Sequence, residues 1–287
     1  MGVRTLGVIG GSGLYQMPGL VDVKEHVVTT TFGEPYAVIT SGMLDGTRLL
    51  FLPRHGRGHR IAPHRINYRA NILALKMLGA EQVVSVSAVG SMQETIRPGD
   101  MVLVDQFIDC TRQRAPTFFD EPGCVAHVGF ADPVDAGLQD ALYRAALVVG
   151  ARVRKGGTYV CIEGPLFSTR AESNLYRSWG VDVIGMTAMP EAKLAREAEL
   201  PYATLSLATD YDCWHQDEEV VTVEAVIEVM KRNVKTAQAI LQRLANDLPD
   251  PALAPATSAL KGAVITPREH IAEQARVRLK PLLAKYL

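Results

Sequence analysis

Short apolar segments rich in strand-forming residues alternate along this chain with amphipathic segments at helical spacing. The strand candidates are residues 4–9, 48–52, 83–87, 101–104, 157–162, 181–184 and 202–208. The helix candidates are residues 65–78, 134–149, 190–199 and 221–244, together with a segment that ends at Ser178. This alternation predicts an α/β fold whose sheet is largely covered by helices. Ligands in such folds bind outside the carboxyl ends of the strands, so residues that follow strands are the first candidates for a functional site.

Length and composition fit one globular domain spanning residues 1–287. The chain is 47 % apolar and 21 % charged, which is ordinary for such a domain. We expect a core at about residues 4–247, a Pro- and Ala-rich linker at 248–266 and a C-terminal helix at 267–287. A net charge of −1 gives no reason to expect nucleic acid or an anionic membrane as a partner. No apolar run approaches the length that spans a membrane.

Four cysteines are widely spaced and form no CxxC pair. This pattern predicts buried thiols in a reducing compartment, not a disulfide framework or a zinc site. The first glycine-rich turn comes at Gly10, too early for the apolar stretch of a signal peptide. We therefore expect a cytoplasmic protein.

Two loops that follow strand candidates suit an anion. The turn at residues 10–13 offers backbone N–H groups and the Ser12 hydroxyl, although a plain tight turn fits it equally well. Residues 53–65 hold four arginines, which would repel a metal cation but whose planar groups grip phosphate oxygens. Arg54 and His55 lie nearest the end of the strand and are the best phosphate candidates.

The strand at residues 202–208 leads to Asp210 and Asp212. In extended chain these two side chains face the same side, so their carboxyl groups can converge. Their mutual repulsion favours a proton on one of them. A protonated carboxyl beside an ionised one complements the N7 acceptor and the 6-amino donor of adenine. The alternative is a pair of loop aspartates that leads into the solvated acidic run at residues 216–219.

Two further segments carry candidates for structural roles. Ser168 follows a Gly-Pro turn and is placed to cap the helix that ends at Ser178. Residues 116–133 are irregular and hold Phe118 and Phe119, for which a compact domain offers no obvious partner. We therefore expect this arm to be a functional loop or a subunit interface.

Several segments together closely resemble the methylthioadenosine phosphorylase family, in order and with matching spacing from about residue 8 to residue 234. They are Gly10–Leu14, Arg54–Gly56, Asn67–Asn71, Asp105–Asp109, Glu163–Pro165, Arg170–Ser173, Met186–Thr187 with Pro190–Glu191, and Ala208–Trp214. The resemblance implies a three-layer α/β/α sandwich around a mixed, mostly parallel sheet, and a homotrimer like those of the trimeric purine nucleoside phosphorylases.

The resemblance also implies an activity in purine and methionine salvage. The reaction is phosphorolysis of 5′-methylthioadenosine to adenine and 5-methylthioribose-1-phosphate, with phosphate as co-substrate and without metal or organic cofactor. The phosphate residues that it implies are Ser12, Arg54, His55, Ser87, Ala88 and Thr187, where Ser12 and Ser87 stand in place of the threonine of many relatives. The nucleoside residues are Met186 on the ribose, Phe167 and Ser168 along the purine, Asp210 and Asp212 at its edge, and Val223, Val226 and a neighbouring subunit's His127 around the methylthio group. In this reaction Asp210 would protonate N7 of the departing adenine.

Three alternatives remain on the sequence alone. A 6-oxopurine phosphorylase acting on inosine, guanosine or methylthioinosine is the nearest, but such relatives typically carry Asn at position 210 and Glu at position 168. A non-catalytic nucleotide-binding module would use the same loops without turnover. A hydrolase would release adenine without phosphate.

Overall fold

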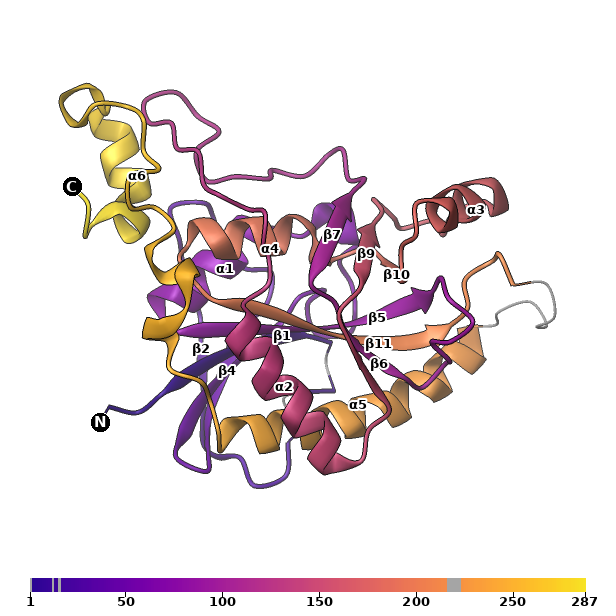
Figure 1. Cartoon of the computed structure of the whole chain (residues 1–287). Helices are drawn as coiled ribbons and strands as arrows, with labels where there is room; N and C mark the ends of the chain where they lie inside the picture. Colours follow the sequence, from indigo (N-terminus) through magenta and orange to yellow (C-terminus); the bar gives the residue numbers. More distant parts are fainter. Residues whose placement is uncertain (1, 12, 15–16, 216–222) are drawn as a thin grey trace.

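In the computed structural model, which describes residues 2–11, 13–14, 17–215 and 223–287, eleven strands form one mixed sheet (Figure 1). The strands are β1 Thr5–Gly10, β2 Val21–His26, β3 Ile39–Leu44, β4 Thr47–Pro53, β5 Gln82–Ser91, β6 Met101–Leu103, β7 Gln106–Asp109, β8 Val153–Lys155, β9 Thr158–Cys161, β10 Val183–Gly185 and β11 Tyr202–Asp210. Their order is β2-β3-β4-β1-β5-β10-β9-β7, and β11, β6 and β8 branch from β5. Six of the ten strand pairs are parallel, as predicted for a mostly parallel sheet.

The long strand β5 is where the sheet divides. On one edge β5 pairs with β11 from Val83 to Gly90. On its other edge it pairs with β1 only as far as Ser85, and with β10 only at Gly90 and Ser91. Residues 86–89 therefore face a gap between β1 and β10 in the described sheet. Main-chain N–H and C=O groups at such a gap need partners, and a polar ligand can supply them.

Helices cover both faces of the sheet (Figure 1). They are α1 Tyr68–Met77, α2 Ala136–Val149, α3 Arg170–Ser178, α4 Ala188–Glu197, α5 Val223–Ala245 and α6 Glu273–Leu283. Leu138 of α2 and Leu241 of α5 share one buried cluster with Leu205 of β11. The helices α1, α4 and α6 contribute to a second cluster, which contains Leu73 and Leu279. This arrangement confirms the predicted α/β/α sandwich.

The helix α3 lies outside these layers, beyond the ends of β9 and β10 (Figure 1). The cap of this helix is Thr169, whose hydroxyl accepts the Glu172 N–H while the Glu172 carboxylate accepts the Thr169 N–H. This capping box requires Ser/Thr at the cap and Glu three residues later. The prediction that Ser168 caps the helix was therefore wrong by one residue, which leaves the Ser168 hydroxyl available for another role.

The arm at residues 116–133 packs on its own chain. Phe118 is fully buried, Phe119 is buried beside it, and the Phe118 ring meets Phe32 edge to face with centroids 5.0 Å apart. The expectation that these aromatic residues lack a partner within the domain was wrong. The sequence pattern missed the partner because Phe32 lies more than eighty residues earlier, in an irregular segment.

The C-terminal residues also pack against the core. Leu260 is almost fully buried, and Val264 forms an antiparallel bridge with Ala126 of the arm. The last helix begins at Glu273, after a short 3-10 turn at Arg268–His270. Residues 248–266 therefore cover part of the domain as well as connecting α5 to α6.

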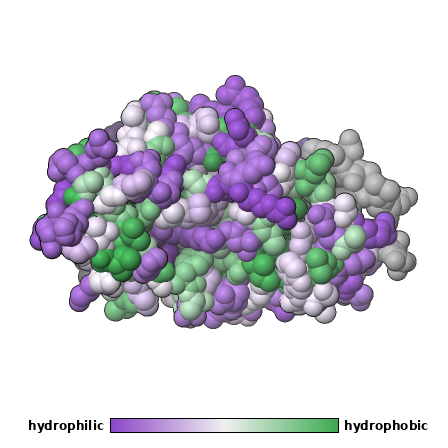
Figure 2. Space-filling model, turned by 90° about the horizontal axis from the view of Figure 1, so that it is seen from above, coloured by the Kyte–Doolittle hydropathy of each residue, from purple (hydrophilic) through white to green (hydrophobic). Residues whose placement is uncertain are grey.

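The face seen from above in Figure 2 is mostly hydrophilic, with separate hydrophobic patches between the polar side chains. Within the described ranges, no helix combines the length and the apolar composition needed to cross a bilayer.

We expect Phe118→Ala to destabilise the protein by ~3–5 kcal/mol, because it removes a fully buried ring and leaves a cavity. The matched control is Leu147→Ala on α2, whose side chain is exposed. Urea unfolding at neutral pH measures both changes. Equal stability of the two variants would contradict the packing of the arm on its own core.

Candidate active site

Seven of the fourteen predicted site residues lie around the gap in β5. They are Arg54 and His55 after β4, Ser87 and Ala88 within β5, Met186 and Thr187 after β10, and Asp210 at the end of β11. Because β4, β1, β5 and β11 run parallel, their carboxyl ends meet at one edge of the sheet. The structure thus brings together residues that are 156 positions apart in sequence (210 − 54).

Arg54 is buried and gripped by a carboxylate. Its Nε donates to Glu191 Oε2 at 2.8 Å, and its Nη2 donates to Glu191 Oε1 at 3.0 Å and to Ser85 Oγ at 2.6 Å. Burial alone would lower the pKa of Arg54, but the Glu191 carboxylate outweighs burial and raises it. The bidentate grip expected for phosphate is therefore taken by Glu191.

The number of unused N–H donors on Arg54 decides how it can bind a ligand. A guanidinium has five N–H donors, and three of them are used by Glu191 and Ser85. A fourth, on Nη1, makes a long contact of 3.4 Å with the Val86 carbonyl in the β5 gap. The Nη1 end of Arg54 therefore faces the gap and can donate to an anion there.

His55 is held as a neutral acceptor. Its Nδ1 lies 2.8 Å from the Ile61 carbonyl oxygen, which can only accept, so Nδ1 carries the proton. Burial, and next the charge of Arg54, lower the pKa of His55 to about 4. Near neutral pH its Nε2 is therefore an acceptor for a P–OH group, or a base that can take up a proton.

Two hydroxyl side chains lie at the same gap. The Ser87 Oγ is buried, and the buried hydroxyl of Tyr159 on β9 lies beside it. Thr187 is also buried, and its side chain does not cap α4, which begins at the next residue. A hydroxyl group can donate one hydrogen bond, so both groups can bind ligand oxygens.

Asp210 and Asp212 converge, but not for the predicted reason. Asp212 has a left-handed backbone (φ +53°) and is not extended chain. A turn brings the two together, because the Asp212 N–H donates to Asp210 Oδ1 at 2.9 Å. Both lie over Gly90, where an added Cβ would be 3.1 Å from Asp210 Oδ1 and 3.3 Å from Asp212 Cβ. A side chain at position 90 would push the two aspartates away.

The two carboxyl groups have different surroundings. Asp210 Oδ2 accepts from the Thr209 hydroxyl at 2.7 Å. Asp212 accepts from the Ser173 hydroxyl of α3, and burial raises the pKa of Asp212. The raised pKa of Asp212 favours a proton on Asp212 in the free site, so a donor role for Asp210 requires that proton to pass between the two carboxyl groups.

The residues predicted to bind the nucleoside differ in how far they are buried. The Ser168 Oγ is buried without a partner among the described residues, and the Met186 sulfur packs against Gly164, where an added Cβ would be 2.5 Å away. Phe167 is 80 % exposed in the single chain. His127 is exposed on the arm and donates its main-chain N–H to the Ala263 carbonyl.

Three predicted positions have no described side chain. Ser12 lies outside the described residues, as do the side chains of Val223 and Val226 in the first turn of α5.

Sequence reasoning assigned no role to Glu191, Tyr202 or Ser173. Glu191 also accepts from the Tyr202 hydroxyl at 3.0 Å, so it joins α4, β4 and β11. A signal was present for Glu191, which is the one acidic residue among apolar neighbours at the start of a helix. Ser173 had no such signal, because its partner lies 39 residues later.

Other parts of the described chain do not compete for this role. A cavity of about 640 Å³ lies between Gln82, Arg196 and residues 249–256, but none of the predicted site residues lines it, and its lining has no histidine or hydroxyl group. Within the described ranges, no three His, Cys, Asp or Glu side chains are grouped so as to hold a metal ion. All four cysteines are free; Cys124 and Cys161 are buried, and Cys110 and Cys213 are half-buried.

The fold and this arrangement of strand ends are those of the phosphorylase superfamily, whose family model matches residues 5–246. The chain is 54 % identical over 285 residues to the S-methyl-5′-thioadenosine phosphorylase of Geobacter sulfurreducens, covering 99 % of each chain. A crystal structure of a methylthioadenosine phosphorylase from an Antarctic soil metagenomic library superimposes with a TM-score of 0.92 at 47 % identity, covering 99 % of this chain and 100 % of that one. The methylthioadenosine phosphorylase of Schistosoma mansoni in complex with adenine gives a TM-score of 0.79 at 36 % identity, covering 84 % and 90 %.

The chain therefore belongs to the methylthioadenosine phosphorylase family within that superfamily. This result confirms the resemblance recognised in the sequence.

The low pKa of His55 predicts how stability depends on pH. An unfolded histidine titrates near ~6.5, whereas native His55 titrates at about 4. Between these values the unfolded chain binds a proton that the native state does not. Stability that is present above pH ~6.5 is therefore lost as the pH falls towards 4, by up to about 3 kcal/mol from this residue.

The test compares urea unfolding from pH 7 to pH 4.5 in wild type, His55→Asn and His270→Asn. His55→Asn should lose less stability than wild type, because it has no imidazole to protonate there. His270 is exposed in the 3-10 turn at Arg268–His270, so His270→Asn serves as the control and should follow wild type. Parallel loss in wild type and His55→Asn would contradict the low pKa.

Proposed function

We propose that this protein catalyses phosphorolysis of 5′-methylthioadenosine to adenine and 5-methylthioribose-1-phosphate. The observation that carries the proposal is the aspartate pair over Gly90, which with one shared proton offers one donor and one acceptor at the edge of the β5 gap. This pattern matches N7 and the 6-amino group of adenine. The family of the chain points to the same reaction.

Phosphate binds in the β5 gap. Its oxygens accept from the Nη1 end of Arg54, from the hydroxyl groups of Ser87 and Thr187, and from the backbone at Ala88, and Ser12 adds a further hydroxyl. The neutral Nε2 of His55 accepts a hydrogen bond from the P–OH group of the bound phosphate.

The charges around the phosphate favour the transition state over the bound substrates. Arg54 and Glu191 together are neutral, and His55 is neutral as well. The negative charge of the phosphate is therefore held by directed hydrogen bonds and is only partly compensated. It is compensated further when the ribose becomes positively charged as the bond from C1′ to N9 breaks. Interactions that strengthen at that point lower the barrier.

Proton transfer completes the reaction. The electron pair of the C1′–N9 bond moves to the base, a phosphate oxygen bonds to C1′, and Asp210 gives N7 the proton that it takes over from Asp212, which leaves Asp212 ionised. Asp212 accepts from the 6-amino group, and a 6-oxo group at the same position would meet the carboxylate as a second acceptor. Met186, Phe167 and Ser168 border the nucleoside, and Val223, Val226 and a neighbouring subunit's His127 border the methylthio group.

The enzyme works as a homotrimer in the cytoplasm, where free thiols persist. Inorganic phosphate is a substrate, and the reaction needs no metal or organic cofactor.

The first test of this function is chromatography of 5′-methylthioadenosine incubated with the protein, with and without phosphate. Adenine should appear only with phosphate. Adenine without phosphate would indicate a hydrolase, and no adenine in either case would overturn the proposal.

In the same assay Arg54→Lys should raise the KM for phosphate ~10- to 100-fold, because lysine loses the directed Nη1 donor. The KM for the nucleoside should change much less, and the exposed control Arg57→Lys should match wild type.

The aspartate pair predicts selectivity between 6-amino and 6-oxo substrates. A site built for one hydrogen-bond pattern can reject the mismatched analogue by ~10⁴–10⁵. Asp210→Asn keeps a donor for N7 but cannot transfer a proton, so kcat/KM for methylthioadenosine should fall by at least ~10². Asp212→Asn removes the charge that opposes O6, so it should narrow the preference over methylthioinosine. If both variants keep the wild-type ratio of the two substrates, the aspartates do not recognise the base.

A further inference from the structure

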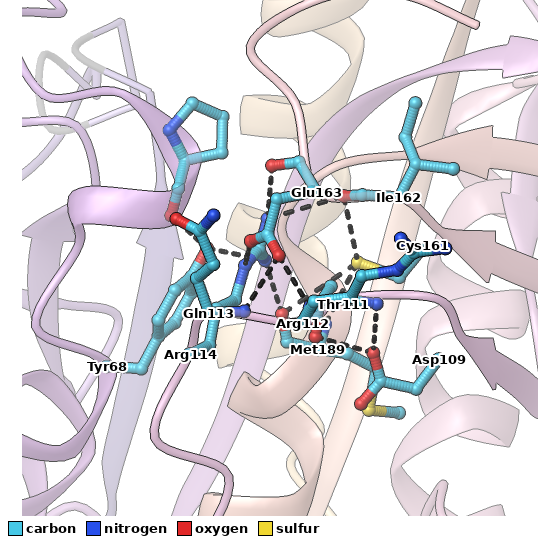
Figure 3. A network of polar contacts seen from close by, with 11 residues as sticks. Tyr68, Asp109, Thr111, Arg112, Gln113, Arg114, Cys161, Ile162, Glu163 and Met189 are labelled. Carbon is cyan, nitrogen blue, oxygen red and sulfur yellow. Dashed lines mark hydrogen bonds and ion pairs between the residues drawn. The ribbon is translucent and has the colours of Figure 1, made fainter.

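Arg114 belongs to the polar network drawn in Figure 3, although it lies in no predicted motif. Its side chain is almost fully buried, and all five of its N–H donors are used. Nε donates to Glu163 Oε1 at 2.9 Å, and Nη2 donates to the carbonyls of Glu163 at 2.7 Å and Ile162 at 3.3 Å. Nη1 donates to the Tyr68 hydroxyl at 3.0 Å and to the Met189 carbonyl.

These acceptors belong to segments that border the candidate site. Ile162 and Glu163 directly follow β9 and lead to Phe167 and Ser168 on the nucleoside side. Met189 lies two residues after Thr187 on the phosphate side. One guanidinium therefore holds the nucleoside segment and the phosphate segment in a fixed relation (Figure 3).

Further hydrogen bonds hold two of the acceptors of Arg114, Glu163 and Tyr68, in place. The Glu163 carboxylate also accepts the main-chain N–H groups of Arg112 and Gln113, which fixes the loop that carries Arg114. The Tyr68 hydroxyl of α1, which accepts from Arg114, itself donates to the Pro63 carbonyl at 3.0 Å. Because no N–H of Arg114 is left over, the residue has no donor for a substrate.

We propose that Arg114 is a positioning residue for phosphorolysis, which aligns the bound nucleoside with the bound phosphate without touching either. The inference rests on the proposed function. Small errors in the alignment of two reactants lower the rate of the chemical step more than they weaken binding of either one. The fork of the guanidinium is what the network uses, and lysine cannot reproduce five donors in that geometry.

The experiment measures kcat and both KM values, with phosphate, for Arg114→Met, Arg114→Lys and Arg112→Met. Arg114→Met and Arg114→Lys should both lower kcat by ~10- to 100-fold and change each KM by less than ~3-fold. Arg112→Met is the matched control, because the exposed Arg112 contributes only its main-chain N–H, which methionine keeps. It should match wild type.

A milder variant covers the case in which the buried substitutions prevent folding. Tyr68→Phe removes one acceptor of Arg114 and leaves the ion pair with Glu163, and it should lower kcat by ~3- to 10-fold with both KM values unchanged. Wild-type rates in Arg114→Met and Tyr68→Phe, full recovery in Arg114→Lys, or a loss confined to KM would each overturn the inference while the proposed function stands. Absence of phosphate-dependent adenine release in wild type would overturn both.

Discussion

The buried pair of Arg54 and Glu191 is the interaction on which the site depends. It joins the end of β4 to the start of α4, and through Ser85 and Tyr202 it also reaches β5 and β11. A buried ion pair gains little net stability, but loss of one partner leaves an uncompensated charge in the interior. The position of the four elements around the β5 gap is therefore tied to one guanidinium and one carboxylate, and the same contact sets how much positive charge the gap offers.

Periodicity and strand chemistry predicted the layers and the strand ends from sequence. The apolar run at residues 202–208 and the glycine-rich turn after β1 are local signals, and local signals define elements. The strands β2, β3, β7 and β8 gave no such signal; β2, for example, is a mostly exposed edge strand. The branch of the sheet at β5 could not be predicted from the sequence either, because it depends on which strands pair and not on which residues form strands.

The functional site, like the fold, could be predicted from the sequence only in part. Arg54, His55 and the two aspartates were found because each lies at or just after the end of a strand and has an ionisable side chain. Glu191 and Arg114 were not given roles, because their function depends on partners 137 and 49 residues away. The convergence of Asp210 and Asp212 was predicted for the wrong backbone: a left-handed turn at Asp212, not extended chain, brings them together. Chemical type was readable from sequence, whereas the contacts that hold each group in place were not.

The helix α3 has a consequence for where the site can open. It lies outside the three layers and buries only Ser173, whose hydroxyl reaches Asp212. Segments with few buried contacts unfold locally at a lower free-energy cost than the core. In the proposed assignment the phosphate end of the site is fixed to the sheet and the adenine end to this peripheral helix, so amide hydrogen exchange should be faster in α3 than around Arg54. A nucleoside can then enter and adenine can leave past α3 without disturbing the ion pair at the other end.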